Sequence, residues 1–213
     1  MPAYQILTPV QPILALCLDV FGTLVQITNH TRPYHALIRR LPQDKQAGAA
    51  ATVMSHHWGL RDAADRLGVD YSETEMAKWE RDLAAEIASI ECFPETLEVL
   101  RDLRKKGYAM ALCSNLAKPY AAPVEALVGK YFDVKVWSFD SGCVKPNPRI
   151  YAKVARELDL PPHRILMSGD MEEADYLAPQ KAGLRAMHLA RKASAEARQA
   201  HQISDLRALL SLG

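Results

Sequence analysis

The sequence predicts a three-layer α/β fold, in which a Rossmann-like parallel sheet is covered by helices on both faces and carries an inserted helical subdomain. Two observations support this prediction. Short apolar runs alternate with amphipathic helical segments from about residue 92 to residue 189, which is typical of parallel strands joined by helices. Between residues 31 and 91, in contrast, the apolar residues recur at helical spacing only.

Composition limits the class of protein and of ligand. The chain has 213 residues, 49% hydrophobic and 24% charged, which is ordinary for a folded globular protein. Lys and Arg number 26 and Asp and Glu 25, so no overall field favours nucleic acid or an anionic membrane, and an anionic substrate needs a local site. Oligomeric state stays open.

The four cysteines and the N-terminal region point to a cytoplasmic protein. The cysteines lie far apart without metal-ligand spacing, so we expect free thiols in a reducing compartment. The first residues have no basic stretch ahead of an apolar run, and no apolar run is long enough to cross a membrane.

The first strand is expected over residues 13–18, a run of six apolar residues that suits a strand buried on both faces. Asp19 follows it directly, and Gly22 and Thr23 come next, as in a tight turn. The carboxyl ends of the strands form the ligand crevice of open α/β sheets. Asp19 is therefore a candidate for chemistry, although a turn-capping aspartate would give the same local pattern.

The inserted subdomain is expected over residues 28–91, which leaves 1–27 and 92–213 for the α/β core. Its clearest helix begins at Ser72, because Ser72 and Glu75 have the spacing of a capping box. Apolar residues fall on one face of this helix, namely Met76, Trp79, Leu83, Ile87 and Ile90.

The rest of the core is expected to alternate between helices and strands. Pro94 is expected to open a helix whose Leu97, Leu100 and Leu103 face the core and which stops at Gly107. Further strands are expected over 108–113, 134–139, 165–168 and 185–189, and helices over 123–129, 147–158, 172–182 and 203–212.

Polar residues with complementary chemistry follow four of these strands. They are Asp19 after the first, Ser114 and Asn115 after the second, Lys145 beyond the third, and Gly169 with Asp170 after the fourth. Together they provide a nucleophilic carboxylate, a hydroxyl donor, an ammonium and a second carboxylate. This set suits an anionic substrate that forms a covalent intermediate on Asp19.

Four ordered segments resemble the motifs of the haloacid dehalogenase-like hydrolase superfamily. The segments are Asp19-Val20-Phe21-Gly22-Thr23-Leu24, Ser114-Asn115, Lys145-Pro146-Asn147-Pro148, and Gly169-Asp170 with Asp175. The resemblance runs from about residue 14 to residue 189, and the inserted helices occupy the place of that family's small helical cap. Each motif alone is weak, whereas the ordered set is specific.

The resemblance implies a role for each of these residues. Asp19 would be the nucleophile, Lys145 would neutralise charge between it and the substrate, and Ser114 and Asn115 would bind the transferring phosphoryl or the substrate carboxylate. Asp170 would hold Mg²⁺ together with Asp19 and the main-chain carbonyl of Phe21. Asp175 would support these ligands without contacting the ion directly, or would reach it through a water. Oxygen ligands of this kind are those that Mg²⁺ prefers.

The sequence departs from the phosphatases of the family at Phe21, where they usually carry an aspartate that acts as general acid and base. An aromatic residue there is typical of the dehalogenase branch, whereas Asp170 is typical of the metal-dependent phosphatases. Because Mg²⁺ would use the carbonyl of Phe21, its ring does not prevent metal binding. A buried Asp170 beside Asp19 would be costly without a cation.

The preferred hypothesis is therefore Mg²⁺-dependent, phosphatase-type hydrolysis of a small phosphorylated metabolite. The alternatives are a 2-haloacid dehalogenase and a catalytically weak homologue that keeps the crevice for binding or regulation.

Other polar residues are assigned to structure. Asn147 and Pro148 have the pattern of an N-cap followed by a first-turn proline. His56 and His57 have no ligand-spaced partner, and we expect them at the surface or in helix packing.

Overall fold

A six-stranded parallel sheet forms the centre of the protein. The computed structural model describes residues 11–194 and 196–212. Every pair of neighbouring strands is parallel. The strand order is β5 (Val134–Trp137), β4 (Ala109–Ser114), β1 (Ala15–Leu18), β6 (Ile165–Gly169), β7 (Arg185–Leu189) and β8 (Gln202–Ile203). The predicted α/β fold is confirmed, and β1 lies between β4 and β6.

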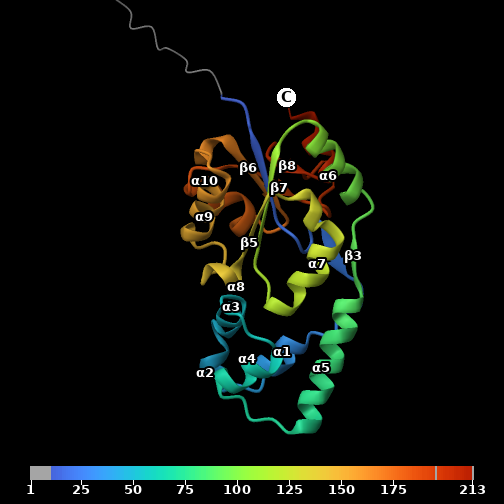
Figure 1. Cartoon of the computed structure of the whole chain (residues 1–213), viewed down its shortest axis with the longest axis vertical. Coiled ribbons are helices and arrows are strands. Elements are labelled where there is room, and N and C mark those ends of the chain that lie inside the picture. Colours follow the sequence, from blue (N-terminus) through green and yellow to red (C-terminus); the bar gives the residue numbers. More distant parts are fainter. Residues whose placement is uncertain (1–10, 195, 213) are drawn as a thin grey trace, which may run out of the picture.

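Helices cover both faces of the sheet, so the chain has the expected three layers (Figure 1). Leu16 and Leu18 point into one apolar cluster and Ala15 and Cys17 into the other, because successive side chains of a strand alternate between faces. Burying a leucine side chain fully stabilises the fold by about 1.5–3 kcal/mol. The covering helices are α6 (Thr96–Lys105) and α7 (Ala121–Val128) on the first face, and α9 (Pro148–Leu158) and α10 (Ala178–Lys181) on the second.

Five helices lie between β1 and α6, below the sheet in Figure 1, and all except α2 contribute to a third apolar cluster. They are α1 (Pro33–Ile38), α2 (Gln43–Gln46), α3 (Ala49–Met54), α4 (Leu60–Leu67) and α5 (Glu73–Ala88). The cluster contains Leu37, Val53 and Met76, all of them buried. The capping box at the start of α5 is confirmed, since Ser72 Oγ accepts from Glu75 N and Glu75 Oε2 accepts from Ser72 N.

A two-stranded antiparallel ribbon stands where the chain leaves the sheet for these helices and where it returns. It consists of β2 (Val25–Ile27) and β3 (Ile90–Cys92). The sequence did not predict it, and the assignment of Ile90 to the face of the preceding helix is wrong, because Ile90 pairs with Ile27 instead. Strands of three residues are too short to produce a recognisable alternation.

The helix α6 begins at Thr96 rather than at Pro94, and this changes the side chain that it buries. Thr96 Oγ1 donates to the carbonyl of Leu24 at 2.7 Å, which turns Thr96 inward. Leu97 is 42% exposed, so the prediction that it faces the core is wrong, whereas Val99 is fully buried. Val99 lies one helical turn before Leu103 and on the same face, whereas Leu97 lies six residues before Leu103 and on another side of the helix.

Three further segments differ from their predicted form. The strand predicted over 134–139 ends at Trp137, and a short helix α8 (Ser138–Ser141) follows. The helix predicted over 172–182 starts as a π-helical turn, Glu172–Leu177, and continues as α10. Pro179 has no N–H, so it cannot make the α-helical hydrogen bond to the carbonyl four residues earlier. The helix predicted over 203–212 is a 3₁₀ helix, Leu206–Ser211.

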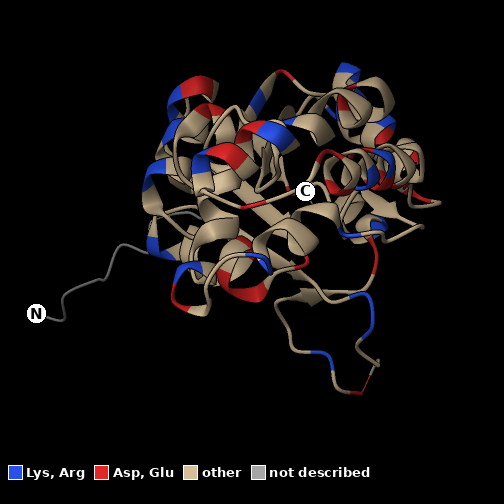
Figure 2. Ribbon diagram, turned by 90° about the horizontal axis from the view of Figure 1, so that it is seen from below, with Lys and Arg blue, Asp and Glu red and all other residues tan. Residues whose placement is uncertain are grey.

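Three short 3₁₀ turns lie between the helices and strands of the described residues outside the 3₁₀ helix named above. The turns span Lys118–Tyr120, Gly129–Tyr131 and Pro162–Arg164. Figure 2 shows positive and negative side chains interspersed over the ribbon, in line with the formal net charge of +1. Over the described residues, every helix is too short or too polar to span a bilayer.

Candidate active site

The ends of four segments meet in one cavity of about 370 Å³ at the carboxyl edge of the sheet. Asp19 and Lys145 are 126 residues apart in the sequence and are in direct contact there. Six of the seven residues singled out by the sequence line this cavity, namely Asp19, Phe21, Ser114, Asn115, Lys145 and Asp170. The seventh, Asp175, is fully buried and contacts Lys145.

Lys145 lies between two carboxylates. Its Nζ is 2.7 Å from Asp19 Oδ1 and 2.6 Å from Asp175 Oδ1, and all three residues are buried. Burial by itself lowers the pKa of Lys145, but the charges of Asp19 and then Asp175 outweigh it and hold the pKa well above its usual value. The side chain is therefore a fixed ammonium, aimed at one oxygen of Asp19.

Asn115 holds the main chain of Lys145 in place. Its Oδ1 accepts from Lys145 N at 2.7 Å, and its Nδ2 donates to Lys145 O at 2.9 Å. Both polar ends of the predicted substrate-binding amide are thus engaged with protein. Ser114, the last residue of β4, is 1% exposed and lines the cavity beside it.

Two glycines, one in the turn after β1 and one at the end of β6, leave room for the acidic side chains. Gly22 has φ +79°, and a Cβ at this position would collide with the carboxylate of Asp170. A Cβ at Gly169 would collide with the carboxylate of Asp175 and lie too close to Asp19. Glycine is therefore required at both positions for the acids to converge.

The acids outnumber the cation in this cluster. One carboxylate oxygen each of Asp19, Asp170 and Asp175 lie within 4.8 Å of one another, beside the single ammonium of Lys145. Burial, and secondly the charge of Asp19, raise the pKa of Asp170. Burial raises the pKa of Asp175 to about 6, against the opposing effect of Lys145. A hard cation with oxygen ligands would relieve this repulsion.

Phe21 places an aromatic ring next to the nucleophile candidate. Its ring meets that of Tyr120 edge-on, with centroids 5.9 Å apart and an interplanar angle of 86°. Phe21 also lines two further cavities, which share residues with the active-site cavity. The residue two positions after Asp19 therefore contributes apolar surface and cannot carry a proton.

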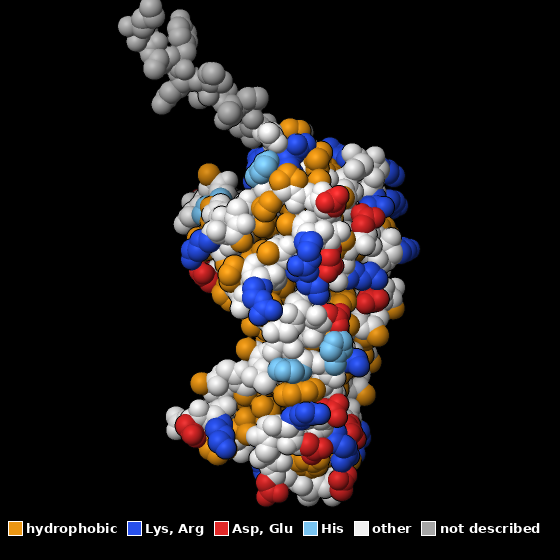
Figure 3. Space-filling view, turned by 60° about the vertical axis from the view of Figure 1, so that its left-hand side comes forward, with side chains coloured by type: hydrophobic (Ala, Val, Ile, Leu, Met, Phe, Trp, Pro, Cys, Tyr) orange, Lys and Arg blue, Asp and Glu red, His pale blue; other side chains and the backbone are white. Residues whose placement is uncertain are grey.

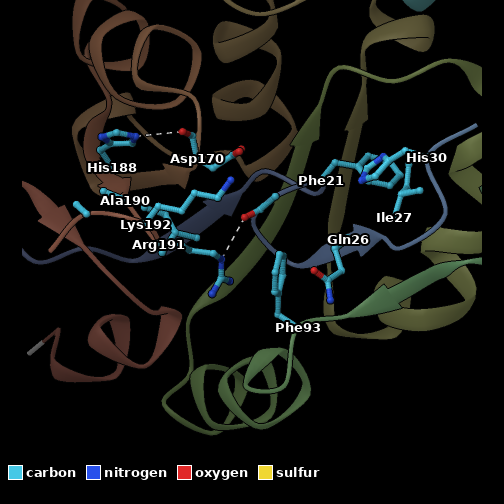
Figure 4. Close-up of a pocket in the computed structure, with 13 residues that line it drawn as sticks. Phe21, Gln26, Ile27, His30, Phe93, Asp170, His188, Ala190, Arg191 and Lys192 are labelled. Carbon is cyan, nitrogen blue, oxygen red and sulfur yellow. Dashed lines mark hydrogen bonds between the residues drawn. The ribbon is translucent and has the colours of Figure 1, made fainter. Parts of the chain in front are cut away.

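Arg191 is a site residue that the sequence reasoning missed. Its guanidinium donates to the carbonyls of Gly22 and Thr23 and to Glu95, and it lies 3.9 Å from the centroid of the Phe93 ring (Figure 4). It thereby fixes the turn that follows the nucleophile candidate. Arg191 comes two residues after β7, so the rule that examines polar residues beyond strand ends could have found it.

His188 is a second residue of this kind. A ring nitrogen of His188 lies 3.0 Å from the main-chain oxygen of Asp170, and Figure 4 shows the imidazole pointing toward that residue. The carbonyl accepts this hydrogen bond, so the ring nitrogen carries the proton. His188 therefore holds the backbone at Asp170.

The residues assigned to structure behave as expected. Asn147 caps α9 by accepting from Arg149 N, which confirms the N-cap. His57 pairs with Asp140 at 2.9 Å, and His56 stacks on Trp58. Both histidines are exposed, which confirms the expectation of surface or helix-packing residues.

Comparison with known proteins identifies the family. The sequence model of the haloacid dehalogenase-like hydrolases matches residues 13–183. The chain is 33% identical over 97 residues, 45% of its length, to glyceraldehyde 3-phosphate phosphatase of Methanothermobacter thermautotrophicus. It is 25% identical over 166 residues, 77% of its length, to the protein of the same name from Methanopyrus kandleri. The matches cover 43% and 60% of these relatives, so the chain spans about half of their length.

Solved structures of the same fold include phosphatases and dehalogenases. A phosphatase from Thermococcus onnurineus superposes with a TM-score of 0.65 at 20% identity, covering 94% of this chain and 99% of the other. A dehalogenase with an intermediate complex gives a TM-score of 0.68 at 19% identity, covering 94% and 96%. These structures share the fold, and the match of the family model to residues 13–183 confirms the resemblance seen in the motifs: the chain belongs to the haloacid dehalogenase-like hydrolase family.

Proposed function

We propose that this hydrolase is a Mg²⁺-dependent phosphatase of small phosphate monoesters, with Asp19 as the nucleophile. The observation that carries the proposal is the ammonium of Lys145, which contacts Asp19 in a cavity that Asp170 also lines. A dianionic phosphoryl group needs such a cation close to the attacking carboxylate. The names of the curated relatives, which are phosphatases of small molecules, support the same class of substrate.

Mg²⁺ would be held by Asp19, Asp170 and the main-chain carbonyl of Phe21. The fit rests on the donor set, since three acids share this corner with one ammonium and the pKa of Asp170 is raised by burial and by Asp19. When bound, the ion would neutralise charge on the phosphoryl oxygens. Asp175, bonded to Lys145 and to the main-chain N–H of Met171, would keep the ammonium in place.

In the reaction, a carboxylate oxygen of Asp19 would attack phosphorus, and the bond from phosphorus to the leaving oxygen would break. Lys145 would orient Asp19 and offset the negative charge of the two partners. The hydroxyl of Ser114 would donate to a phosphoryl oxygen. Water would then attack the aspartyl phosphate, release inorganic phosphate and regenerate Asp19.

The helices of residues 28–91 would act as a cap over the core of residues 1–27 and 92–213. Their apolar cluster includes Ala117, which follows β4, so the two parts meet beside the site. Figure 3 shows the molecule narrowing between the sheet-bearing part and these helices. The free state of all four cysteines supports a cytoplasmic location. The expected partner is a small anionic substrate, without nucleic acid or membrane.

A 2-haloacid dehalogenase is the second candidate, and Phe21 is the observation that favours it. A departing halide needs no proton, so an aromatic ring beside Asp19 suffices there. Release of halide from 2-chloropropionate in the presence of a chelator would support this candidate, and its absence across several haloacids would remove it.

The decisive experiment measures phosphate release from a panel of phosphate monoesters, with Mg²⁺ and with a chelator. We expect release that requires Mg²⁺ and falls at least 10³-fold in Asp19→Asn, because the nucleophile is lost. Asp44→Asn, at an exposed position of α2, is the matched control and should keep full activity. Absence of metal-dependent release from every ester would refute the proposal.

A further inference from the structure

An apolar chamber opens next to the active-site cavity. It has a volume of about 330 Å³, at the small end of ligand pockets, and it shares Phe21 and Asn115 with that cavity. Its walls come from α1, α3 and the segment after β4, and they include Ile38, Val53, Met54 and Tyr120. A group attached to a phosphate beside Asp19 can therefore extend into this chamber.

The chamber has no charged wall except for a histidine. Among the described residues that line it, none is Asp, Glu, Lys or Arg, and His35 is the one residue that could carry a charge at neutral pH. Burying a carboxylate or a hydroxyl there without a partner is costly. The substrates in the relatives' names, glyceraldehyde 3-phosphate and phosphoglycolate, carry such polar groups, so this chamber suits a different leaving group.

The hydroxyl of Tyr34 does not add an accessible polar atom to this apolar wall. Its Oη is buried and has no hydrogen-bond partner among the described residues, although the ring lines the chamber. The chamber wall therefore stays apolar at this point.

The absence of an acid at position 21 sets the reactivity of the leaving group. Phe21 cannot donate a proton, and His35 lines the chamber but not the cavity that holds Asp19. A phenolic oxygen, with a pKa of about 10 as in tyrosine, leaves as an anion much more readily than an aliphatic alkoxide. Shape and chemistry thus select the same class of compound.

Building on the function proposed above, we infer that the substrates are aryl phosphate monoesters with an uncharged ring. Asp19 attacks phosphorus, the bond between phosphorus and the aryl oxygen breaks, and the phenolate departs with the electron pair and takes a proton from solvent. Water then cleaves the aspartyl phosphate. The ring occupies the chamber and packs against Phe21 and Tyr120, whose side chains form part of its wall.

The test compares kcat/KM for four phosphates at fixed Mg²⁺. 2-Naphthyl phosphate tests the chamber, cyclohexyl phosphate has a ring but a poor leaving group, phosphoglycolate is charged, and acetyl phosphate reports phosphoryl transfer without a ring. We expect 2-naphthyl phosphate to exceed cyclohexyl phosphate and phosphoglycolate at least 100-fold. If phosphoglycolate equals or exceeds 2-naphthyl phosphate while acetyl phosphate is hydrolysed, the inference is wrong and the phosphatase proposal stands. If none of the four is hydrolysed, the phosphatase proposal itself fails.

Ile38→Lys tests the location of the ring. A lysine in the chamber wall should lower the ratio of kcat/KM for 2-naphthyl phosphate to that for acetyl phosphate at least tenfold. Leu97→Lys is the matched control, because Leu97 is exposed on α6 and lines none of these cavities. Should Ile38→Lys lose its circular dichroism spectrum, Ala50→Lys, at an exposed position of the same wall, replaces it. An unchanged ratio in a folded chamber variant would overturn the assignment.

Discussion

The ammonium of Lys145 lies 2.7 Å from Oδ1 of Asp19, although 126 residues separate them in the chain. Both side chains are buried, and Asp175 contacts the same ammonium from the other side. Such a cluster keeps its charges only because each is paired, since an isolated buried charge would shift its pKa and become neutral. The consequences can be measured in stability as well as in activity.

Lys145→Met should unfold far more easily than the parent protein. It leaves Asp19 and Asp175 buried without their cation, and removing one partner of a buried ion pair costs about 3–5 kcal/mol. Urea denaturation measures the change. Lys153→Met is the control, because Lys153 pairs only loosely with Glu157, at 3.8 Å, and its other bonds go to the uncharged Asp140 carbonyl and Ser141 hydroxyl. Ion pairs at the surface contribute at most about 1 kcal/mol. Equal losses in the two variants would contradict the pairing.

Gly22→Ala should abolish Mg²⁺-dependent phosphate release. The added methyl group would collide with the carboxylate of Asp170 and move this candidate ligand. Gly48→Ala is a matched control, since Gly48 has the same φ of +79° but nothing within 4 Å of the added atom. Both variants share the backbone strain of about 1–2 kcal/mol, so only the loss of activity distinguishes them. Full activity in Gly22→Ala would exclude Asp170 from the reaction.

Asp170→Asn should stabilise the metal-free protein and remove its response to Mg²⁺. The pKa of Asp170 is raised by burial and by Asp19, so the ionised form costs free energy in the fold at pH 7 and a neutral amide relieves that cost. The melting temperature without metal should rise by on the order of 2–4 °C. Added Mg²⁺ at about 100 times its Kd should stabilise the parent by about 2.7 kcal/mol and leave the variant unchanged. A parent that is insensitive to Mg²⁺ would argue against the metal site.

Phe21→Asp should accelerate the hydrolysis of alkyl phosphates such as cyclohexyl phosphate. It supplies the proton donor that the ring lacks, and general acid catalysis contributes about 10²–10⁴ in rate. Phe21→Asn is the control, because asparagine is polar and has nearly the same size as aspartate but cannot act as a general acid. The gain should appear in kcat for alkyl phosphates and be small for aryl phosphates. Equal rates in the Asp and Asn variants would show that position 21 does not face the leaving oxygen.

The thiol of Cys17 should stay unreactive until the protein unfolds. Burial, and secondly a hydrogen bond with Cys113, raise its pKa well above the usual value, so little thiolate exists at pH 8. Cys92 is only partly buried and should react first with a chromogenic disulfide reagent. Cys92→Ser should remove the fast phase and leave the slow phase, which follows the rate of unfolding. Rapid modification of Cys17 in the folded protein would contradict the buried position of β1.

Much of the core could be read from local pattern. The apolar runs that became β1, β4 and β6 are buried on both faces in a parallel sheet, and a continuous hydrophobic strand of this kind is visible in a single sequence. The parallel arrangement then requires the strand ends to share one edge. That is why Asp19, Ser114, Lys145 and Asp170 could be expected together before any coordinates were known.

Contacts between distant residues decided the rest. The bond from Thr96 to the carbonyl of Leu24 joins residues 72 apart and attaches the start of α6 to the core. The side-chain amide of Asn115 bonds to the main chain of Lys145, 30 residues away, and the local sequence around either residue does not predict these two hydrogen bonds.

By itself the sequence determined the family, the layered sheet and the residues that line the cavity, because each depends on residue type and on order along the chain. Only the tertiary structure decided that Lys145 contacts both Asp19 and Asp175 and that Arg191 fixes the turn at Gly22. It also decided that an apolar chamber is lined by Phe21. Those features arise from side chains of separate elements packing in three dimensions, and their distances are not encoded in the spacing of any one segment.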